Sequence, residues 1–227
     1  MLRKWDDLPD SIRIPEVRPY YDRLSRKRAG IILKRIFDIA VSLVMIILLS
    51  IPMIIIALLI KTDSPGPVFY RQERVTAYGK VFRIHKFRTM VTDAEKRGTA
   101  VTVSGDPRIT SIGRKLRKLR LDEIPQLFDV LAGDMSFVGT RPEAVRYVER
   151  YRPEYYATLL LPAGITSEAS IRFKDEEKML SLAGDVDKVY VEEILPQKMV
   201  YNLEAVSDFS LLAELRTMLK TVIAVLR

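Results

Sequence analysis

One apolar stretch, Ile39–Ile60, limits the folds open to this chain more than any other feature. It contains 22 residues and no charged side chain. As a helix it would be about 33 Å long, which is enough to cross the hydrocarbon core of a bilayer. A helix that is apolar on every side is either deeply buried or in a membrane, and burial at this length would be unusual. We therefore assign residues 34–61 to a membrane element.

Two features of this segment bear on how it meets the membrane. Pro52 stands past its midpoint and removes a backbone hydrogen bond, which invites a bend. Basic residues flank both ends, from Arg26 to Arg35 on one side and from Lys61 to Arg74 on the other. Because positive charge collects on the cytoplasmic side, both ends are expected there, and a re-entrant helical hairpin satisfies this. A single proline-kinked span is the alternative, since prolines are tolerated in membrane helices.

Composition narrows the chemistry that the chain can perform. Its 227 residues include no cysteine and one histidine, so thiol chemistry and a multi-histidine metal site are excluded. A bound metal would be a hard cation held by oxygen atoms, such as Mg²⁺. The formal net charge of +8 and the isoelectric point near 9.6 predict anionic partners: lipid headgroups, phosphorylated substrates or nucleic acid.

Two regions flank the membrane element. Residues 1–33 are polar and contain prolines, which predicts a partly ordered arm or an ordinary disordered tail. Residues 62–227 show no convincing internal boundary, and we expect one cytosolic domain of α/β class, mostly α. It should begin with a β-hairpin that turns at Ala77–Lys80, followed by amphipathic helices. The last helix, over 210–227, has an apolar stripe that is expected to face the core, with the membrane interface as the alternative.

The second strand of the expected hairpin carries two basic side chains that could face a phosphate. Lys86 and Arg88 share one face if the strand stays extended as far as Arg88. His85 is expected to be packed rather than to act as a ligand or base. Downstream, Ser111 can cap a helix whose basic residues, Arg117 among them, face anionic headgroups and a phosphate, with a solvated face as the alternative.

Candidate catalytic and binding residues are most concentrated in the stretch Arg117–Pro142. Asp122 and Glu123 are adjacent carboxylates, and Pro125 then begins a short apolar helix that Gly133 ends. Unpaired N–H groups at a helix N-terminus favour anions, so a phosphate and a divalent cation could be held together there. The basic neighbours are expected to keep Asp122 ionised. For an isolated Asp-Glu pair, simple first-turn negative charge would be the better explanation.

Several motifs in one order resemble the bacterial monotopic phosphoglycosyl transferases. KFRTM begins at Lys86, DPRITSIGRKLR at Asp106 and LDEIPQLFDVLAGDMSFVGTRP at Leu121, all after a hydrophobic segment. The family pattern is L-D-E-L-P-Q-L, G-D-M-S and V-G-P-R-P, and the resemblance covers most of residues 34–170. It implies a re-entrant membrane helix with a small cytosolic catalytic domain, located at the cytoplasmic face of a bacterial inner membrane.

The resemblance also implies a reaction and roles for particular residues. A sugar 1-phosphate would pass from a UDP-sugar to polyprenyl phosphate, such as undecaprenyl phosphate, by a ping-pong mechanism that releases UMP. This is a first membrane step in polysaccharide or glycoconjugate assembly. Asp122 would attack the sugar-bearing phosphate, and Glu123 would help to hold Mg²⁺ beside Asp122 or would position the nucleophile. Substrate-binding roles are implied for Lys86, Arg88, Arg117 and Arg141.

Departures from the family pattern indicate a divergent member. Thr140 replaces the first proline of P-R-P, and an inserted Ala163 displaces the glycine-threonine motif. Asn202 stands where the family often has an aspartate. The transferred sugar and any homo-oligomer are not determined by the sequence.

A hypothesis from another class is a membrane-tethered, non-catalytic binder of anionic lipid or nucleic acid. Its basis is the positive charge and the apolar segment. It leaves the carboxylate pair without a purpose, and the aromatic residues do not alternate with bases as they do in single-strand binders. We therefore expect lipid and phosphorylated substrates, and no nucleic acid, as partners.

Overall fold

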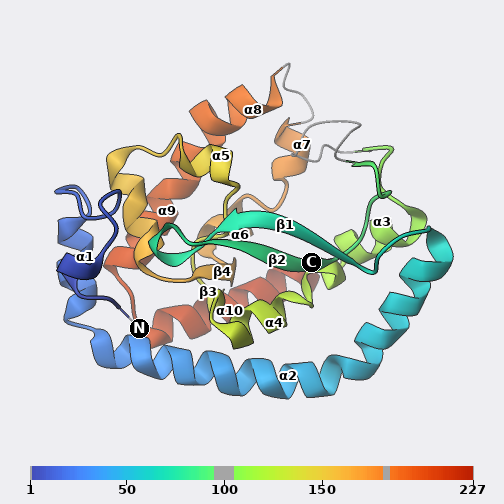
Figure 1. Cartoon of the computed structure of the whole chain (residues 1–227), viewed down its shortest axis with the longest axis horizontal. Helices are drawn as coiled ribbons and strands as arrows, with labels where there is room; N and C mark the ends of the chain where they lie inside the picture. The colour runs from blue at the N-terminus through green and yellow to red at the C-terminus, as the bar shows by residue number, and fades with distance from the viewer. Residues whose placement is uncertain (1, 95–104, 181–184, 227) are drawn as a thin grey trace.

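A computed structural model describes residues 2–94, 105–180 and 185–226. Within them the chain is mostly helical, and its short strands form two separate two-stranded sheets (Figure 1). The helices are α1 (Arg18–Ser25), α2 (Arg28–Asp63), α3 (Ser111–Lys118), α4 (Gln126–Ala132), α5 (Val145–Val148), α6 (Glu168–Arg172), α7 (Glu176–Leu180), α8 (Val186–Val189), α9 (Leu195–Ser207) and α10 (Leu211–Leu226). The strands are β1 (Phe69–Val75), β2 (Val81–Phe87), β3 (Met135–Val138) and β4 (Ala163–Thr166). The predicted class is confirmed as a mostly helical chain with small sheets.

α2 is one continuous helix of 36 residues that follows one side of the molecule (Figure 1). Pro52 lies inside it and does not end it, although the helix bends in its second half (Figure 1). The missing N–H removes one backbone hydrogen bond, so a helix can continue past a proline with a kink. The structure therefore shows a single bent helix, and not the two separate helices expected for a re-entrant helical hairpin. Of the described helices, α2 is long and apolar enough to cross a membrane, and 11% of its most apolar window is buried.

Both ends of α2 are attached to the same body of the protein. Near its start, the Lys34 ammonium donates to a carbonyl of β3 at 2.9 Å. One turn later, Asp38 accepts a hydrogen bond from the Ser136 hydroxyl at 2.8 Å. Near its end, Ile60 packs into an apolar cluster with Phe87 of β2. The exposed apolar side chains therefore concentrate between these two attachments.

The predicted β-hairpin is confirmed. β1 and β2 pair antiparallel, with Phe69 opposite Phe87. In the turn between them, Tyr78 and Gly79 have φ angles of 61° and 73°, the left-handed conformation that lets a short connection reverse the chain. This pairing fixes the end of β2, where the candidate basic residues lie.

β3 and β4 pair in parallel, with Ser136 opposite Gly164. Just beyond β3 the two backbones come so close that a Cβ on Gly164 would overlap the backbone of Gly139. Glycine is required there because no other residue permits this approach. The Gly164 N–H also donates to the Thr140 carbonyl at 2.9 Å. The displaced glycine motif therefore supports the loop that carries Arg141.

Residues 2–27 are folded against the C-terminal helices, more fully than the predicted partly ordered arm and unlike its alternative, a disordered tail. Leu8, Ile12 and Leu24 are buried in the same apolar cluster as Met199 of α9. The apolar residues of this segment are few and irregularly spaced, so no periodic pattern marked them before their partner surface was known. The segment is thus part of the main core.

α10 directs its apolar stripe outward, so the prediction that this stripe faces the core is wrong. Leu212, Leu219 and Val222 are 69%, 67% and 58% exposed. On another side of the helix, Glu214 forms an ion pair with Lys34 of α2 at 2.6 Å. α10 therefore lies beside α2, and both helices expose apolar side chains (Figure 1).

Candidate active site

The two adjacent carboxylates lie on a tight turn between two helices. Arg120, just after α3, has a left-handed backbone conformation (φ 55°) that turns the chain. Asp122 and Glu123 then form a 3-10 turn, and Pro125 precedes α4 as its N-cap residue. Gly133 (φ 93°) ends α4 in the left-handed conformation, as predicted. This local arrangement buries both carboxylates, which are 7% and 8% exposed.

Glu123 is the centre of a cluster of ion pairs. Arg141 donates through Nη1 to Oε2 at 3.3 Å and through Nη2, at closer range, to Oε1. Lys86 Nζ lies 3.1 Å from Oε1, and Arg120 lies 3.8 Å away. Burial by itself would raise the pKa of Glu123, but Arg141 and Lys86 outweigh it and hold that pKa well below its ordinary value. Glu123 is therefore ionised at neutral pH.

Asp122 has the opposite electrostatic balance. Its Oδ1 is buried and has no hydrogen-bond partner in the part of the chain that the structure describes. Burial raises the pKa of Asp122, Lys86 opposes it, and the charge of Glu123 raises the pKa further. The net shift of the pKa is upward, because burial and Glu123 outweigh the basic neighbours Lys86, Arg117 and Arg120, which each lower it. Lys86 and Arg141 bond to Glu123 instead, and the two neighbouring carboxylates become chemically different.

Of the two basic residues expected on β2, Lys86 lies at this site and Arg88 does not. β2 ends before Arg88, so the condition for a shared face is not met. The buried Arg88 donates from Nε to the Pro67 carbonyl at 2.6 Å and from Nη2 to the Ser64 carbonyl at 2.8 Å. Its guanidinium therefore closes the turn that follows α2.

The basic run of α3 supplies further positive charge. Arg117 is half-buried and lowers the pKa of Asp122 electrostatically, although burial dominates that shift. Thr110, and not Ser111, caps the helix by accepting a hydrogen bond from an N–H of the first turn at 3.0 Å. Sequence reasoning did not single out Arg120, although its place three residues before the ion-paired carboxylate was an available signal.

Two other polar residues have local structural roles, which is the role predicted for His85. His85 Nδ1 lies 2.6 Å from an oxygen of the buried Asp129, so the ring is held by packing and this bond. Asp106 accepts from the Arg108 side chain at 2.6 Å and from its backbone N–H at 2.9 Å. Neither residue contributes to the carboxylate cluster.

Comparison with known proteins places this chain in a family. The model of the bacterial sugar transferases matches residues 29–227. The chain belongs to the bacterial sugar transferase family. The resemblance seen in the motifs is thus confirmed, and residues 2–27, which pack against α9, lie outside the matched range.

Of three relatives similar to this bacterial sugar transferase, two are named as transferases acting on undecaprenyl phosphate and one as an exopolysaccharide production protein. The chain is 35% identical over 197 residues to the UDP-N-acetylgalactosamine-undecaprenyl-phosphate N-acetylgalactosaminephosphotransferase of Aeromonas hydrophila. The matched region covers 86% of this chain and 44% of that relative. The chain is 35% identical over 192 residues to the UDP-glucose:undecaprenyl-phosphate glucose-1-phosphate transferase of Caulobacter vibrioides, covering 83% and 68%. It is 37% identical over 201 residues to the exopolysaccharide production protein PSS of Rhizobium leguminosarum bv. phaseoli, covering 86% and 95%.

The oxygen atoms of this transferase site suit a cation that is shared with a substrate. Among the described residues, no cluster of three or more His, Cys, Asp and Glu side chains could hold a metal by itself. Asp122 Oδ1 is a buried oxygen without a partner, the kind of atom that a cation would satisfy. Mg²⁺ commonly binds one or two carboxylates together with substrate phosphates and water. The residues fit Mg²⁺ in that mode.

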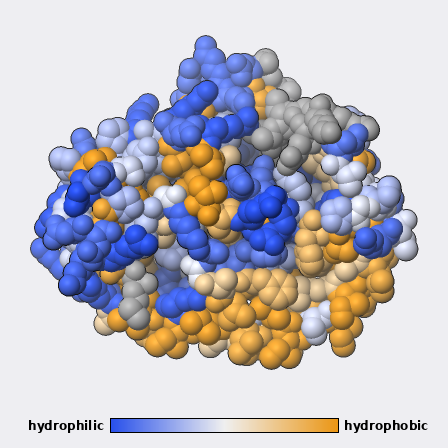
Figure 2. Space-filling view, viewed as in Figure 1, coloured by the Kyte–Doolittle hydropathy of each residue, from blue (hydrophilic) through white to orange (hydrophobic). Residues whose placement is uncertain are grey.

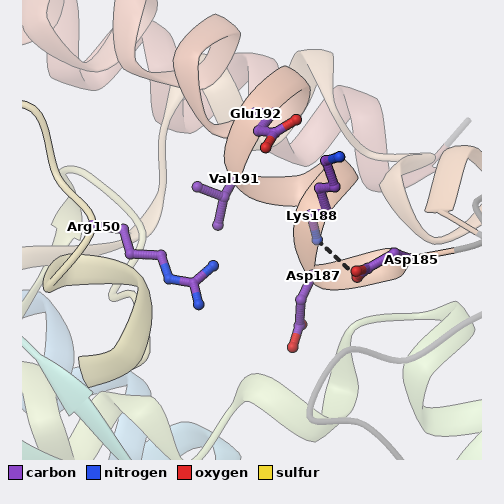
Figure 3. Close-up of a pocket in the computed structure, with 6 residues that line it drawn as sticks. All are labelled: Arg150, Asp185, Asp187, Lys188, Val191 and Glu192. Carbon is purple, nitrogen blue, oxygen red and sulfur yellow. Dashed lines mark hydrogen bonds between the residues drawn. The ribbon is translucent and has the colours of Figure 1, made fainter.

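A cavity of about 430 Å³ lies apart from the carboxylates. It is lined by Arg150, Asp185, Asp187, Lys188, Val191 and Glu192 (Figure 3). Its charged side chains do not converge on one point, and none of the predicted site residues lines it (Figure 3). The candidate site residues that the structure brings together therefore lie around the Asp122–Glu123 turn and not at this cavity.

Sequence reasoning missed a second buried polar cluster beside Arg141. It consists of Glu143, Tyr190 and Lys198, which come together from distant parts of the chain. No short motif marks it, because its members are 47 and 8 residues apart. Asn202, at the departure from the family pattern, is buried on α9 with its Nδ2 3.8 Å from the Met199 sulfur.

Proposed function

We propose that this protein transfers a sugar 1-phosphate from a UDP-sugar to undecaprenyl phosphate and releases UMP. The observation that carries the proposal is the buried Asp122–Glu123 pair, with Lys86 and Arg141 bonded to Glu123. Family membership and the names of the relatives support the same reaction. A positively charged site can hold a diphosphate, and the nearby apolar helices suit a lipid acceptor.

The proposed mechanism has two displacements at phosphorus. Asp122 attacks the sugar-bearing phosphate of the donor, the phosphoanhydride bond breaks, and UMP takes the bonding electron pair. The acceptor phosphate then attacks the phosphorus of the aspartyl phosphosugar and frees Asp122. The raised pKa of Asp122 and its partnerless Oδ1 support a nucleophilic role, since an ionised carboxylate with few donors around it is poorly stabilised and reactive.

The remaining residues of the cluster would bind charge and fix geometry. Arg141 presents a planar fork that suits two oxygens of the uridine-side phosphate. Lys86 would contact the phosphate between donor and nucleophile, and Arg117 would attract the acceptor phosphate. Asp122 and Glu123 would hold Mg²⁺, which when bound neutralises charge on the diphosphate.

Attachment of both ends of α2 to one body favours the re-entrant arrangement. Lys34 and Asp38 fix the start of the helix to β3, while Ile60 fixes its end beside Phe87 of β2. A transmembrane path would separate these ends by the thickness of a bilayer, and the folded domain would then have to lie on both sides. The helix would instead enter one leaflet with its exposed middle, from the cytoplasmic face that its basic flanks indicate.

α10 would rest on the same membrane surface as α2. The exposed apolar side chains of α2 form a band along one edge of the molecule (Figure 2), and α10 lies next to that helix (Figure 1). We expect Leu219→Glu to weaken binding to vesicles in a flotation assay, because a charge would replace a residue that is 67% exposed on the apolar stripe. Val200→Glu, at a residue 63% exposed on α9, is the matched control that should bind normally. Equal loss in both variants would contradict a membrane role for α10.

A UMP-release assay with a panel of UDP-sugars and undecaprenyl phosphate tests the proposed reaction. We expect release that depends on one or a few donors. Lipid binding without UMP release from any donor would favour the alternative, a non-catalytic membrane-tethered binder.

A further inference from the structure

A buried lysine on α9 binds two carboxylates that come from other parts of the fold. Lys198 is 5% exposed, and its Nζ lies 3.1 Å from Glu176 of α7 and 3.6 Å from Glu143. It also donates to the Tyr190 hydroxyl at 3.0 Å, and that hydroxyl in turn donates to Glu143 at 2.6 Å. A buried ammonium without partners is strongly unfavourable, so these contacts are needed to keep Lys198 inside.

A π-helical turn brings Tyr190 and Lys198 to the same face. In a regular α-helix, residues eight positions apart differ by roughly 80° around the axis, so their side chains diverge. Between α8 and α9 the chain forms a π-helical turn, Tyr190–Ile194, which accommodates one extra residue and restores the alignment. Pro196 lies two residues beyond the end of this turn, and its missing N–H is one reason for the irregular turn. π-Helical turns occur frequently at functional sites.

Two connections lead from Lys198 to Arg141. Glu143 lies two residues beyond Arg141, and its carbonyl accepts from the Val75 N–H at 2.9 Å, so its position fixes the end of the loop. Glu123 raises the pKa of Arg141 most, burial opposes it, and the charge of Glu176 raises it further. The side chain of Glu176 is 25% exposed. Glu176, which Lys198 holds at 3.1 Å, is therefore an anion whose charge also acts on Arg141.

We propose that Lys198 is a positioning residue that holds Glu176 and Glu143 away from Arg141, so that Arg141 stays beside Glu123 and binds the donor diphosphate. Without the ammonium, the cluster next to Arg141 gains one net negative charge. The guanidinium would then be attracted towards Glu176 and away from the donor. This inference rests on the proposed function through the role of Arg141, and it adds a determinant of donor binding outside the carboxylate turn.

Donor binding and half-reaction kinetics of Lys198→Met test the inference. UDP binding, measured by isothermal titration calorimetry, should weaken about tenfold, which corresponds to about 1.4 kcal/mol. In ping-pong kinetics the kcat/KM for each substrate reports its own half-reaction, so kcat/KM for the UDP-sugar should fall while that for undecaprenyl phosphate is unchanged. Adding Glu176→Gln should restore most of the loss, because it removes the competing anion.

Several outcomes would overturn the inference. A purely structural lysine predicts an equal loss for both substrates, and no recovery in the Lys198→Met/Glu176→Gln double variant. Unchanged UDP binding would also contradict it. Lys188→Met, which removes an exposed lysine from the preceding α8, is the matched control and should behave as wild type.

A second variant covers the case in which Lys198→Met does not fold. Tyr190→Phe removes the hydroxyl that joins Lys198 to Glu143 and should cause a smaller loss of the same kind, confined to the donor. No donor-specific change in a folded Tyr190→Phe would refute the inference. UDP binding does not depend on turnover, so a wild type that binds UDP but releases no UMP would refute the proposed reaction while leaving the positioning role measurable.

Discussion

Replacing Asp122 by Asn should make the protein more stable at neutral pH, in contrast to the usual loss when a buried charge is altered. Burial raises the pKa of Asp122, and its Oδ1 has no partner among the described residues. A carboxyl with a raised folded pKa contributes its stability below the unfolded pKa and loses it as pH rises through the folded pKa. Asn avoids that loss, and we expect a gain on the order of 1 kcal/mol at neutral pH.

The gain should shrink as pH falls towards about 3.9, the ordinary pKa of aspartate, because wild-type Asp122 then becomes protonated. Thermal unfolding in EDTA measures this difference on the metal-free protein. Glu123→Gln is the matched comparison: it breaks the buried pairs with Arg141 and Lys86, and we expect it to destabilise the fold by about 3 kcal/mol or more. The same chemical change at two adjacent residues should therefore have opposite signs.

The effects of the same two substitutions on catalysis should differ from their effects on stability. Asp122→Asn removes the proposed nucleophile, and we expect UMP release to fall by about 10⁴ to 10⁶-fold. Glu123→Gln should be severely slowed but can retain covalent capture. Wild type incubated with its UDP-sugar and no acceptor should gain one phosphosugar mass, which undecaprenyl phosphate then removes. An adduct located on Glu123 by peptide mass spectrometry, no adduct at all, or a destabilised Asp122→Asn would refute this reasoning.

Three further predictions concern the metal, the membrane topology and Arg88. EDTA should abolish UMP release and Mg²⁺ should restore it, because the site offers two carboxylates to a hard cation; full turnover in chelator would exclude the metal role. The chain has no cysteine, so single cysteines at the exposed Arg23 and Glu193 can be labelled selectively. Neither should react with an impermeant thiol reagent in intact cells, and labelling at position 23 alone would show a true span. Arg88→Ala should lower the free energy of unfolding by about 3 kcal/mol, because three partly buried hydrogen bonds to Ser64 and Pro67 are lost, while donor KM in the folded fraction stays unchanged. A large rise in donor KM without loss of Tm would restore Arg88 to substrate binding.

Local features of the fold and site were predictable from the sequence because they depend on neighbouring residues. The length of Ile39–Ile60 determines a long apolar helix, and the Pro125 and Gly133 signals determine the helix that follows the carboxylates. Turn-forming residues at Ala77–Lys80 determine the hairpin. In each case the backbone preference of a few residues decides the structure, whatever the rest of the chain does.

The difference between the pKa values of the two carboxylates was decided by tertiary structure. Asp122 and Glu123 have the same basic residues nearby in sequence, yet their pKa values shift in opposite directions. The difference arises because Arg141 and Lys86, distant in the chain, bond to one carboxylate and leave an oxygen of the other buried without a partner. Burial and distance set the energy of a charge, and neither is readable before the chain is folded.

The arrangement of distant segments also explains the other differences between the predicted and the observed structure. The role of Arg88 depended on where β2 ends relative to the turn after α2. The outward stripe of α10 and the inward packing of residues 2–27 depended on which apolar surfaces were already covered. An amphipathic helix has one apolar side in either case, and its own sequence does not say whether protein or membrane will cover it. The packing of distant segments decides which surface covers that apolar side, because the hydrophobic effect favours burial without specifying a partner.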